Sequence, residues 1–310
     1  MPEQVNSKEK RAAYKTDLTD EQWGLVVGLI PQAVAKGGCA PTDLREIVNT
    51  LLYQTHTGCQ WDMLPHDLAK KSTAFDYYSA WQKQGIWQAV LDGLRGQVRV
   101  ATPRASDAAP APGQEAAPLP GQQSTPLAQP AADCRPDTAQ RDATPSFVIL
   151  DSQSVKTTEV GGEQRGYDGG KKVKGRKRHI AVDTLGLLCA VVVTAANVSD
   201  GKGACRLLDQ LTPQRFPRLQ GGCGDGRYNE KSLLAKVQQR GWTWEVKSRP
   251  PGSKGFVLLK KRWVVERTFA WLGFNRRLSK DYERSVASSE ARVRIAAIAM
   301  MLRRLAKKAA

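Results

Sequence analysis

The sequence predicts a mixed α/β domain that follows an all-helical domain. Three observations carry this prediction: helical periodicity over residues 17–98, a stretch from 100 to 145 with almost no large apolar residues, and β-branched runs alternating with helical segments from 146 onward. We therefore divide the chain into a helical domain (1–99), an Ala/Pro/Gln-rich linker (100–145) and an α/β domain (146–310). The linker cannot bury enough apolar surface to offset its ordering entropy, so we expect it to be disordered.

Four helices are predicted in the first domain. Thr19 and Gln22 have the spacing of a capping box, and the helix that they begin should end by Pro31. Short helices joined by tight turns suit a helix-turn-helix module that binds DNA ends, although the helices of any small bundle look the same. The other three helices are expected over 42–58, 72–84 and 86–94.

In the second domain, the apolar run 147–150 predicts a strand that ends at Asp151. Two further strands, 179–183 and 187–194, flank a hairpin turn at 184–186. Asp225 follows a glycine-rich run, and another strand is expected over 242–247. Helices are predicted over 204–211, 230–239, 261–272 and 288–308.

Positive charge is concentrated in the second domain. The formal net charge is +17, and residues 147–310 hold 33 Lys/Arg against 14 Asp/Glu. A field of one sign on one domain indicates a polyanionic partner, and nucleic acid is the leading candidate. Attraction to a membrane surface is the rival, but we find no long basic amphipathic face with bulky apolar residues opposite it.

The six cysteines contain no C-x-x-C pair, so they indicate neither a zinc site nor a disulfide framework. The first residues carry charge and lack the apolar core of a signal peptide. We therefore expect a cytoplasmic protein without a membrane partner.

Three carboxylates form the candidate catalytic set: Asp151 at a strand end, Asp225 beside glycines, and Glu266 on a helix. Taken singly, each favours a structural role, namely a capped turn, an Asp-Gly turn and a solvated pair with Arg262. Taken together, they offer the hard oxygen ligands that Mg²⁺ prefers. Two such ions can clamp the attacking and leaving oxygens of a phosphoryl transfer.

Several long runs around these residues resemble the transposases of bacterial insertion sequences. The closest resemblance is to the insertion-sequence-five family of DDE enzymes, within the insertion-sequence-four-like group. The runs cover nearly the whole chain apart from the linker. They are Thr57–Pro65, Asp151–Thr157, Gly166–Asp168, Gly170–His179, Val182–Gly186, Arg262–Leu272 and Asn275–Glu283.

The resemblance implies a ribonuclease-H-like catalytic domain in which Asp151, Asp225 and Glu266 are the DDE residues and hold two Mg²⁺ ions, with Mn²⁺ as a substitute. It implies cleavage at the ends of an insertion sequence and direct strand transfer into target DNA, without a covalent protein–DNA intermediate. The partners would be double-stranded DNA, as terminal inverted repeats and target, and further copies of the chain in a dimer or larger synaptic assembly. The alternatives are a non-catalytic DNA-binding protein derived from a decayed transposase, and a stand-alone nuclease.

The sequence departs from the family pattern at two places. Gly224 and Arg227 flank Asp225 where the family has an A-D-x-G-Y form, and Gly273 stands where the broader group has a Lys seven residues after the Glu. Positive residues near the carboxylates are the predicted DNA contacts, most of them in a basic run that we expect to form a loop. They are Lys156, Lys171, Lys172, Lys174, Arg176, Lys177, Arg178, Arg262, Arg276 and Arg277.

Overall fold

The computed structural model describes residues 11–32, 41–104, 140–247 and 262–309. The predicted disorder of the linker falls almost wholly on residues 105–139, which lie outside the described part. No helix in the described ranges is long and apolar enough to cross a membrane. The four cysteines in those ranges, Cys59, Cys189, Cys205 and Cys223, are free thiols.

The first three N-terminal helices begin and end close to where the sequence predicts. Thr19 caps α1 (Asp20–Val27) through the predicted capping box with Gln22. Glycines in the left-handed conformation follow α2 and precede α4: Gly58 has φ 75° and Gly85 has φ 73°. The elements are α1, α2 (Leu44–Thr57), η1 (Trp61–Met63), α3 (Lys71–Lys83) and α4 (Ile86–Val100), the last of which is longer than predicted.

One six-stranded mixed sheet forms the centre of the α/β part. Its antiparallel strands are β1 (Phe147–Lys156), β2 (Gly166–Asp168), β3 (Val173–Val182) and β4 (Leu188–Ala195), and β3 lies between β1 and β4. On the other side of β1, β5 (Gly221–Asp225) and β6 (Thr243–Lys247) run parallel to it. The predicted β3–β4 hairpin is confirmed, with Gly186 at φ 79° in its turn. The prediction that the first strand ends at Asp151 is wrong, because β1 continues to Lys156 by pairing with β3.

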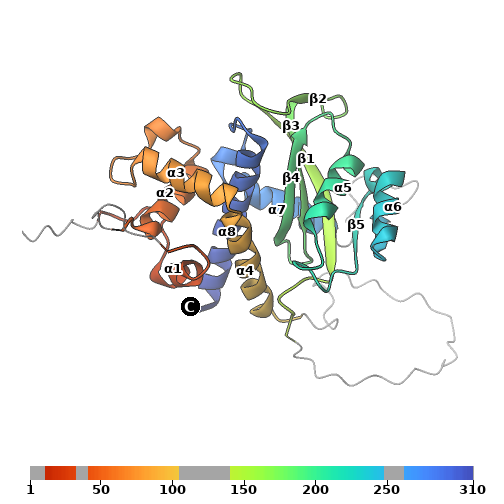
Figure 1. Ribbon diagram of the computed structural model, residues 1–310, viewed down its shortest axis with the longest axis horizontal. Coiled ribbons are helices and arrows are strands. Elements are labelled where there is room, and N and C mark those ends of the chain that lie inside the picture. The colour runs from red at the N-terminus through yellow and green to blue at the C-terminus, as the bar shows by residue number, and fades with distance from the viewer. Residues whose placement is uncertain (1–10, 33–40, 105–139, 248–261, 310) are drawn as a thin grey trace, which may run out of the picture.

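Helices cover both faces of the sheet (Figure 1). Strands and helices alternate after the hairpin, as predicted. On one face, α5 and α6 pack over a core that includes Val148, Leu150 and Leu207. On the other face, α7 and α8 share a core with Ile149 and Cys223. The remaining elements are α5 (Asp200–Gln210), η2 (Gly226–Tyr228), α6 (Lys231–Gln239), α7 (Arg262–Gly273), η3 (Arg276–Leu278) and α8 (Val286–Ala309).

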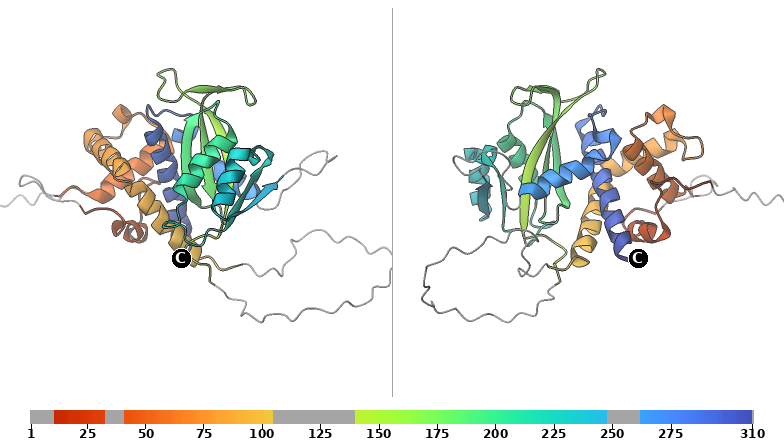
Figure 2. Two further views of the ribbon diagram at one scale, coloured as in Figure 1. Left: turned by 45° about the vertical axis from the view of Figure 1, so that its right-hand side comes forward. Right: turned by 180° about the vertical axis from the view of Figure 1, so that it is seen from behind.

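The last helix completes the N-terminal helical layer. Helix α8 packs against β4 on one side and against helices α1–α4 on the other, and α4 also reaches β4 itself (Figure 2). Its buried Arg292 stacks on Tyr78 of α3 at 4.3 Å and donates to Thr55 Oγ1 of α2 at 3.2 Å. One hydrophobic core therefore runs from Leu18 to Leu302 across the two predicted domains.

Helix α5 approaches the sheet closely at Gly203. A Cβ added there would lie 2.1 Å from Cε1 of His179, a buried β3 side chain whose Nε2 is 3.0 Å from Thr194 Oγ1. Burial lowers the pKa of His179 to about 4, so the imidazole is neutral and held between helix and sheet.

We predict that Gly203→Ala destabilises the protein by about 1–3 kcal/mol, because the added methyl group must push α5 away from His179. The matched control is Gly24→Ala in α1, where a Cβ meets no atom within 4 Å, and there stability should rise by about 0.5–1 kcal/mol. Urea unfolding measures both changes. A Gly203→Ala protein that unfolds at the wild-type midpoint would contradict the described packing.

Candidate functional site

The pairing of two strands brings Asp151 and Asp225 to the same level of the sheet. Strand β1 pairs in parallel with β5 through Phe147↔Gly221, Val148↔Gly222 and Ile149↔Cys223. This register has an offset of 74 residues, which is also the separation of Asp151 from Asp225. Because side chains alternate along a strand, both carboxylates project to the face that carries Ile149, Cys223 and α7.

Asp151 is half-buried and is held by its own chain. The Ser152 amide donates to Asp151 Oδ1 at 2.7 Å. Burial raises the pKa of Asp151 to about 6, although the Ser152 hydrogen bond and the charge of Arg262 lower it. The neighbouring charge of Asp225 raises the pKa of Asp151 further.

Asp225 ends β5 and caps the 3₁₀ turn that follows. Its Oδ1 accepts a hydrogen bond from the Arg227 amide at 2.9 Å. Its Oδ2 lies 3.4 Å from an Arg262 guanidinium nitrogen, and the side chain keeps 19% of its surface exposed. This fixed carboxylate therefore has one face toward solvent and one toward α7.

Glu266 lies one helical turn after Arg262 on α7 and is half exposed. Arg262 Nε is 3.6 Å from Glu266 Oε1, so one guanidinium contacts both Asp225 and Glu266. No group of three or more His, Cys, Asp or Glu residues in the described ranges is arranged to hold a metal ion. The structure thus brings Asp151 and Asp225 together and leaves Glu266 nearby, linked to Asp225 through Arg262.

The charges and oxygen atoms of the two aspartates at this site fit a divalent cation. Two carboxylates on neighbouring parallel strands, one of them with a raised pKa, are a charge arrangement that a cation would stabilise. Their oxygens are the hard ligands that Mg²⁺ and Mn²⁺ accept. Glu266 is the third ligand of the predicted set. A metal ion there would compete with Arg262 for the Glu266 carboxylate.

A polar network that the sequence did not reveal lies behind the carboxylates. Asp200, the first residue of α5, accepts a hydrogen bond from Ser152 Oγ at 2.6 Å and lies 3.2 Å from Lys177 Nζ. Its other oxygen lies 3.5 Å from Arg227. Burial alone would raise the pKa of Asp200, but Ser152 and Lys177 outweigh it and lower that pKa. Asp200 therefore connects Ser152, next to Asp151, with Arg227, two residues after Asp225.

Both departures beside Asp225 have a structural consequence. A Cβ at Gly224 would lie 2.6 Å from Cγ of the buried Tyr228 ring, so glycine lets this ring lie against β5. Arg227 makes the contact with Asp200 just described. Gly273, in contrast, has open space around it.

The expectation that the basic run Lys171–Arg178 forms a loop is wrong, because most of the run is the first half of β3. Lys171, Lys172 and Lys174 are exposed, and Lys171 Nζ donates to the Ser152 carbonyl at 3.2 Å, close to Asp151. Arg176, Lys177 and Arg178 are buried at 0%, 5% and 4% exposure. These three side chains point into the two layers that sandwich the sheet, where DNA does not reach them.

Each buried cation of β3 has protein partners. Arg176 pairs with Asp281 at 3.1 Å and donates to the carbonyls of Glu163, Glu283 and Arg284. Arg178 donates to the Leu278 carbonyl at 2.7 Å. The sequence pattern could not separate these roles, since all of these partners except Glu163 are about 100 residues away.

The remaining predicted DNA contacts divide in the same way. Lys156, at the end of β1, and Arg276 are exposed. Arg277 is buried and pairs with Glu283 at 2.8 Å, so it connects η3 with the segment before α8. Because its guanidinium is buried and paired, the structure gives no support to Arg277 as a DNA contact.

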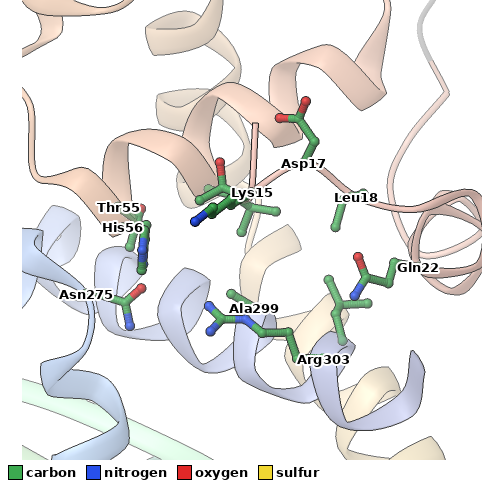
Figure 3. Close-up of a pocket in the computed structure, with 12 residues that line it drawn as sticks. Lys15, Asp17, Leu18, Gln22, Thr55, His56, Asn275, Ala299 and Arg303 are labelled. Carbon is green, nitrogen blue, oxygen red and sulfur yellow. The ribbon is translucent and has the colours of Figure 1, made fainter. Parts of the chain in front are cut away.

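A cavity of about 260 Å³ lies elsewhere, between the N-terminal segment, α2 and α8 (Figure 3). Lys15, His56 and Arg303 line it, and Asp17 is the one carboxylate among its described lining residues. Because a metal centre needs several such oxygens, this cavity is not a second candidate for the carboxylate site.

Two family models and one relative match parts of this chain. Residues 142–302, more than half of the chain, match the family described as "Transposase DDE domain". Residues 18–91 match a family described as a transposase of the IS4/5 family. A protein of Burkholderia cepacia, described as a transposase for insertion sequence element IS402, is 34% identical over 116 residues. That similarity covers 36% of this chain and 54% of the relative, so the chain spans about half the length of the relative it matches.

We predict that Arg176→Met lowers the free energy of unfolding by about 3–5 kcal/mol, because it leaves Asp281 buried without its ionic partner. Lys174→Met, two residues away and exposed, is the control and should change stability by less than about 0.5 kcal/mol. Chemical denaturation gives both values. If Arg176→Met were as stable as wild type and only weakened DNA binding, Arg176 would be a DNA contact after all.

Proposed function

Because this chain belongs to the family of transposases with a DDE domain, we propose that it cleaves the ends of an insertion sequence and joins them to target DNA by direct phosphoryl transfer. Family membership implies a DNA substrate and dependence on a divalent metal. The observation that supports the proposal is the register of the parallel strands β1 and β5, which places Asp151 beside Asp225.

We also propose that the α/β part is ribonuclease-H-like. Three long antiparallel strands lead into two parallel strands that alternate with helices. The sequence predicts the three early strands and the later strand at 242–247, but not β5. The candidate residues lie where β5 ends, at the edge of the sheet where α/β sites collect.

In the proposed reaction, Asp151, Asp225 and Glu266 would hold two Mg²⁺ ions, which would supply charge stabilisation for the attacking and leaving oxygens. The protein's own side chains orient the substrate. Lys171 is exposed beside Asp151, where it can neutralise a phosphate oxygen of the cleaved strand. Arg262 contacts Asp225 and Glu266 in the free protein and can turn to the phosphate backbone when the carboxylates have other partners.

No side-chain nucleophile is needed in this scheme. Water attacks the phosphodiester at each end of the element and leaves a 3′-hydroxyl, which then attacks a phosphodiester of the target. The bond to the leaving oxygen breaks as the bond to the attacking oxygen forms, so the number of phosphodiesters is preserved in the joining step. We further propose a dimer or larger assembly that pairs the two ends, with helices α1–α4 as the end-binding module.

The test is cleavage and joining of DNA that carries the repeats flanking the gene, in Mg²⁺. We expect Asp151→Ala, Asp225→Ala and Glu266→Ala each to reduce cleavage by at least about 10²–10³-fold, the usual effect of losing one electrostatic element of a transition-state site. Asp209→Ala, an exposed α5 carboxylate paired with Lys236, is the matched control and should keep wild-type rates.

The same assay separates the alternatives. Full cleavage by any one of the three variants removes that residue from the metal site. Cleavage without joining would indicate a stand-alone nuclease. Binding without cleavage by the wild-type chain would indicate a decayed transposase that retains only its DNA surface.

A further inference from the structure

A second strongly charged site lies at the opposite end of β1 from the carboxylates. It is a polar pocket of about 310 Å³ where the end of α4, the start of β1 and the β3–β4 turn meet. Four arginines from four segments converge on it. The pocket is lined by Arg99, Arg104, Arg141, Pro145, Ser146, Phe147, Thr184 and Arg218.

The base of this arginine pocket is rigid because it contains a buried ion pair. Arg99 is 7% exposed and lies 2.6 Å from the fully buried Asp183. The other oxygen of Asp183 accepts hydrogen bonds from the Leu185 and Leu187 amides at 2.9 and 2.8 Å. Arg99 Nε also donates to the Asp142 carbonyl at 2.9 Å. The guanidinium at the base is therefore fixed in place before any ligand arrives.

The pocket holds more positive than negative charge. Asp183 forms its ion pair with Arg99. The carboxylate of Asp142 pairs with both Arg218 and Arg104, and it lies 3.7 Å from Arg104. Within the described ranges, Arg141 contacts no carboxylate, and its Nε donates to the Pro103 carbonyl at 3.3 Å. Burial, followed by the charges of Arg99 and Arg104, lowers the pKa of Arg141, as expected where like charges converge.

Phosphate is the ligand that this arrangement suits. Guanidinium groups donate in a planar fork that matches phosphate oxygens, and four of them here surround a space with little apolar surface. Asp151 lies four residues along β1 from Phe147, a rise of about 13 Å. About four base pairs of duplex cover the same distance, so one DNA molecule is long enough to contact both places.

We propose that the arginine pocket binds a phosphodiester of the DNA backbone outside the catalytic site, with Arg141 and Arg104 as the contacts that Arg99 supports from below. The proposal rests on the proposed function in taking DNA as the substrate. It adds a second point of attachment that fixes the direction in which the duplex crosses the sheet.

The experiment measures binding of a fluorescent duplex by the full chain without divalent metal, over a series of KCl concentrations. For the double variant Arg104→Gln/Arg141→Gln we expect affinity to fall at least about fivefold, and the slope of log affinity against log salt to lose about 0.9 for each phosphate contact removed. Arg206→Gln, an exposed arginine of α5, is the matched control and should leave the slope of the wild type. Arg141→Lys, which keeps the charge and loses the fork, should retain most of the slope.

A parallel arm adds inorganic phosphate and follows the melting temperature, which also shows that each variant is folded. If phosphate stabilises the wild type but the double variant binds DNA normally, the pocket is a free-anion site and the proposal is wrong. Equal DNA affinity and slope in wild type and double variant likewise overturn it. A wild-type chain that binds no duplex at all contradicts the proposed function instead, so the two failures are distinguishable.

Discussion

The parallel pairing of β1 with β5 is the constraint on which the candidate site depends. Its register places Asp151 level with Asp225, although 74 residues separate them, and the alternation of side chains turns both toward α7. Backbone hydrogen bonds and the buried side chains of Ile149 and Cys223 fix this register. A slip of one residue would move either carboxylate to the opposite face of the sheet, so the alignment is a property of the core.

The charges around this pairing are arranged by layer. On the α7 side, the carboxylates of Asp225 and Glu266 share one guanidinium, that of Arg262. One positive charge leaves these two negative charges only partly neutralised. On the α5 side, Asp200 and Lys177 form a closed network with Ser152. Arg176 and Arg178 point toward the helical layer and bind the segment before α8. The chain thus uses part of its positive charge to hold its layers together and leaves Lys171, Lys172 and Lys174 for a polyanion.

The sequence predicted those features that have a local cause. The capping box at Thr19, the glycine turns at Gly58 and Gly186, and the alternation of strands and helices all follow from neighbouring residues. The polar second half of β1 was missed because its stability comes from β3, and β2 was missed because it has three residues. Arg176 and Arg178 seemed accessible because the segment that they bind, before α8, lies about 100 residues away in sequence. Asp200 has no local motif, since its contact with Ser152 spans 48 residues.

The central claim is that Asp151 and Asp225 together bind a divalent metal, and Mn²⁺ tests it without requiring any DNA reaction. The direct measurement is the loss of the free Mn²⁺ paramagnetic resonance signal on titration with protein. We expect saturable binding by the wild type that weakens at least about tenfold in Asp151→Asn and in Asp225→Asn, because each loses a charged oxygen ligand. Unchanged Mn²⁺ binding in either variant would contradict the claim.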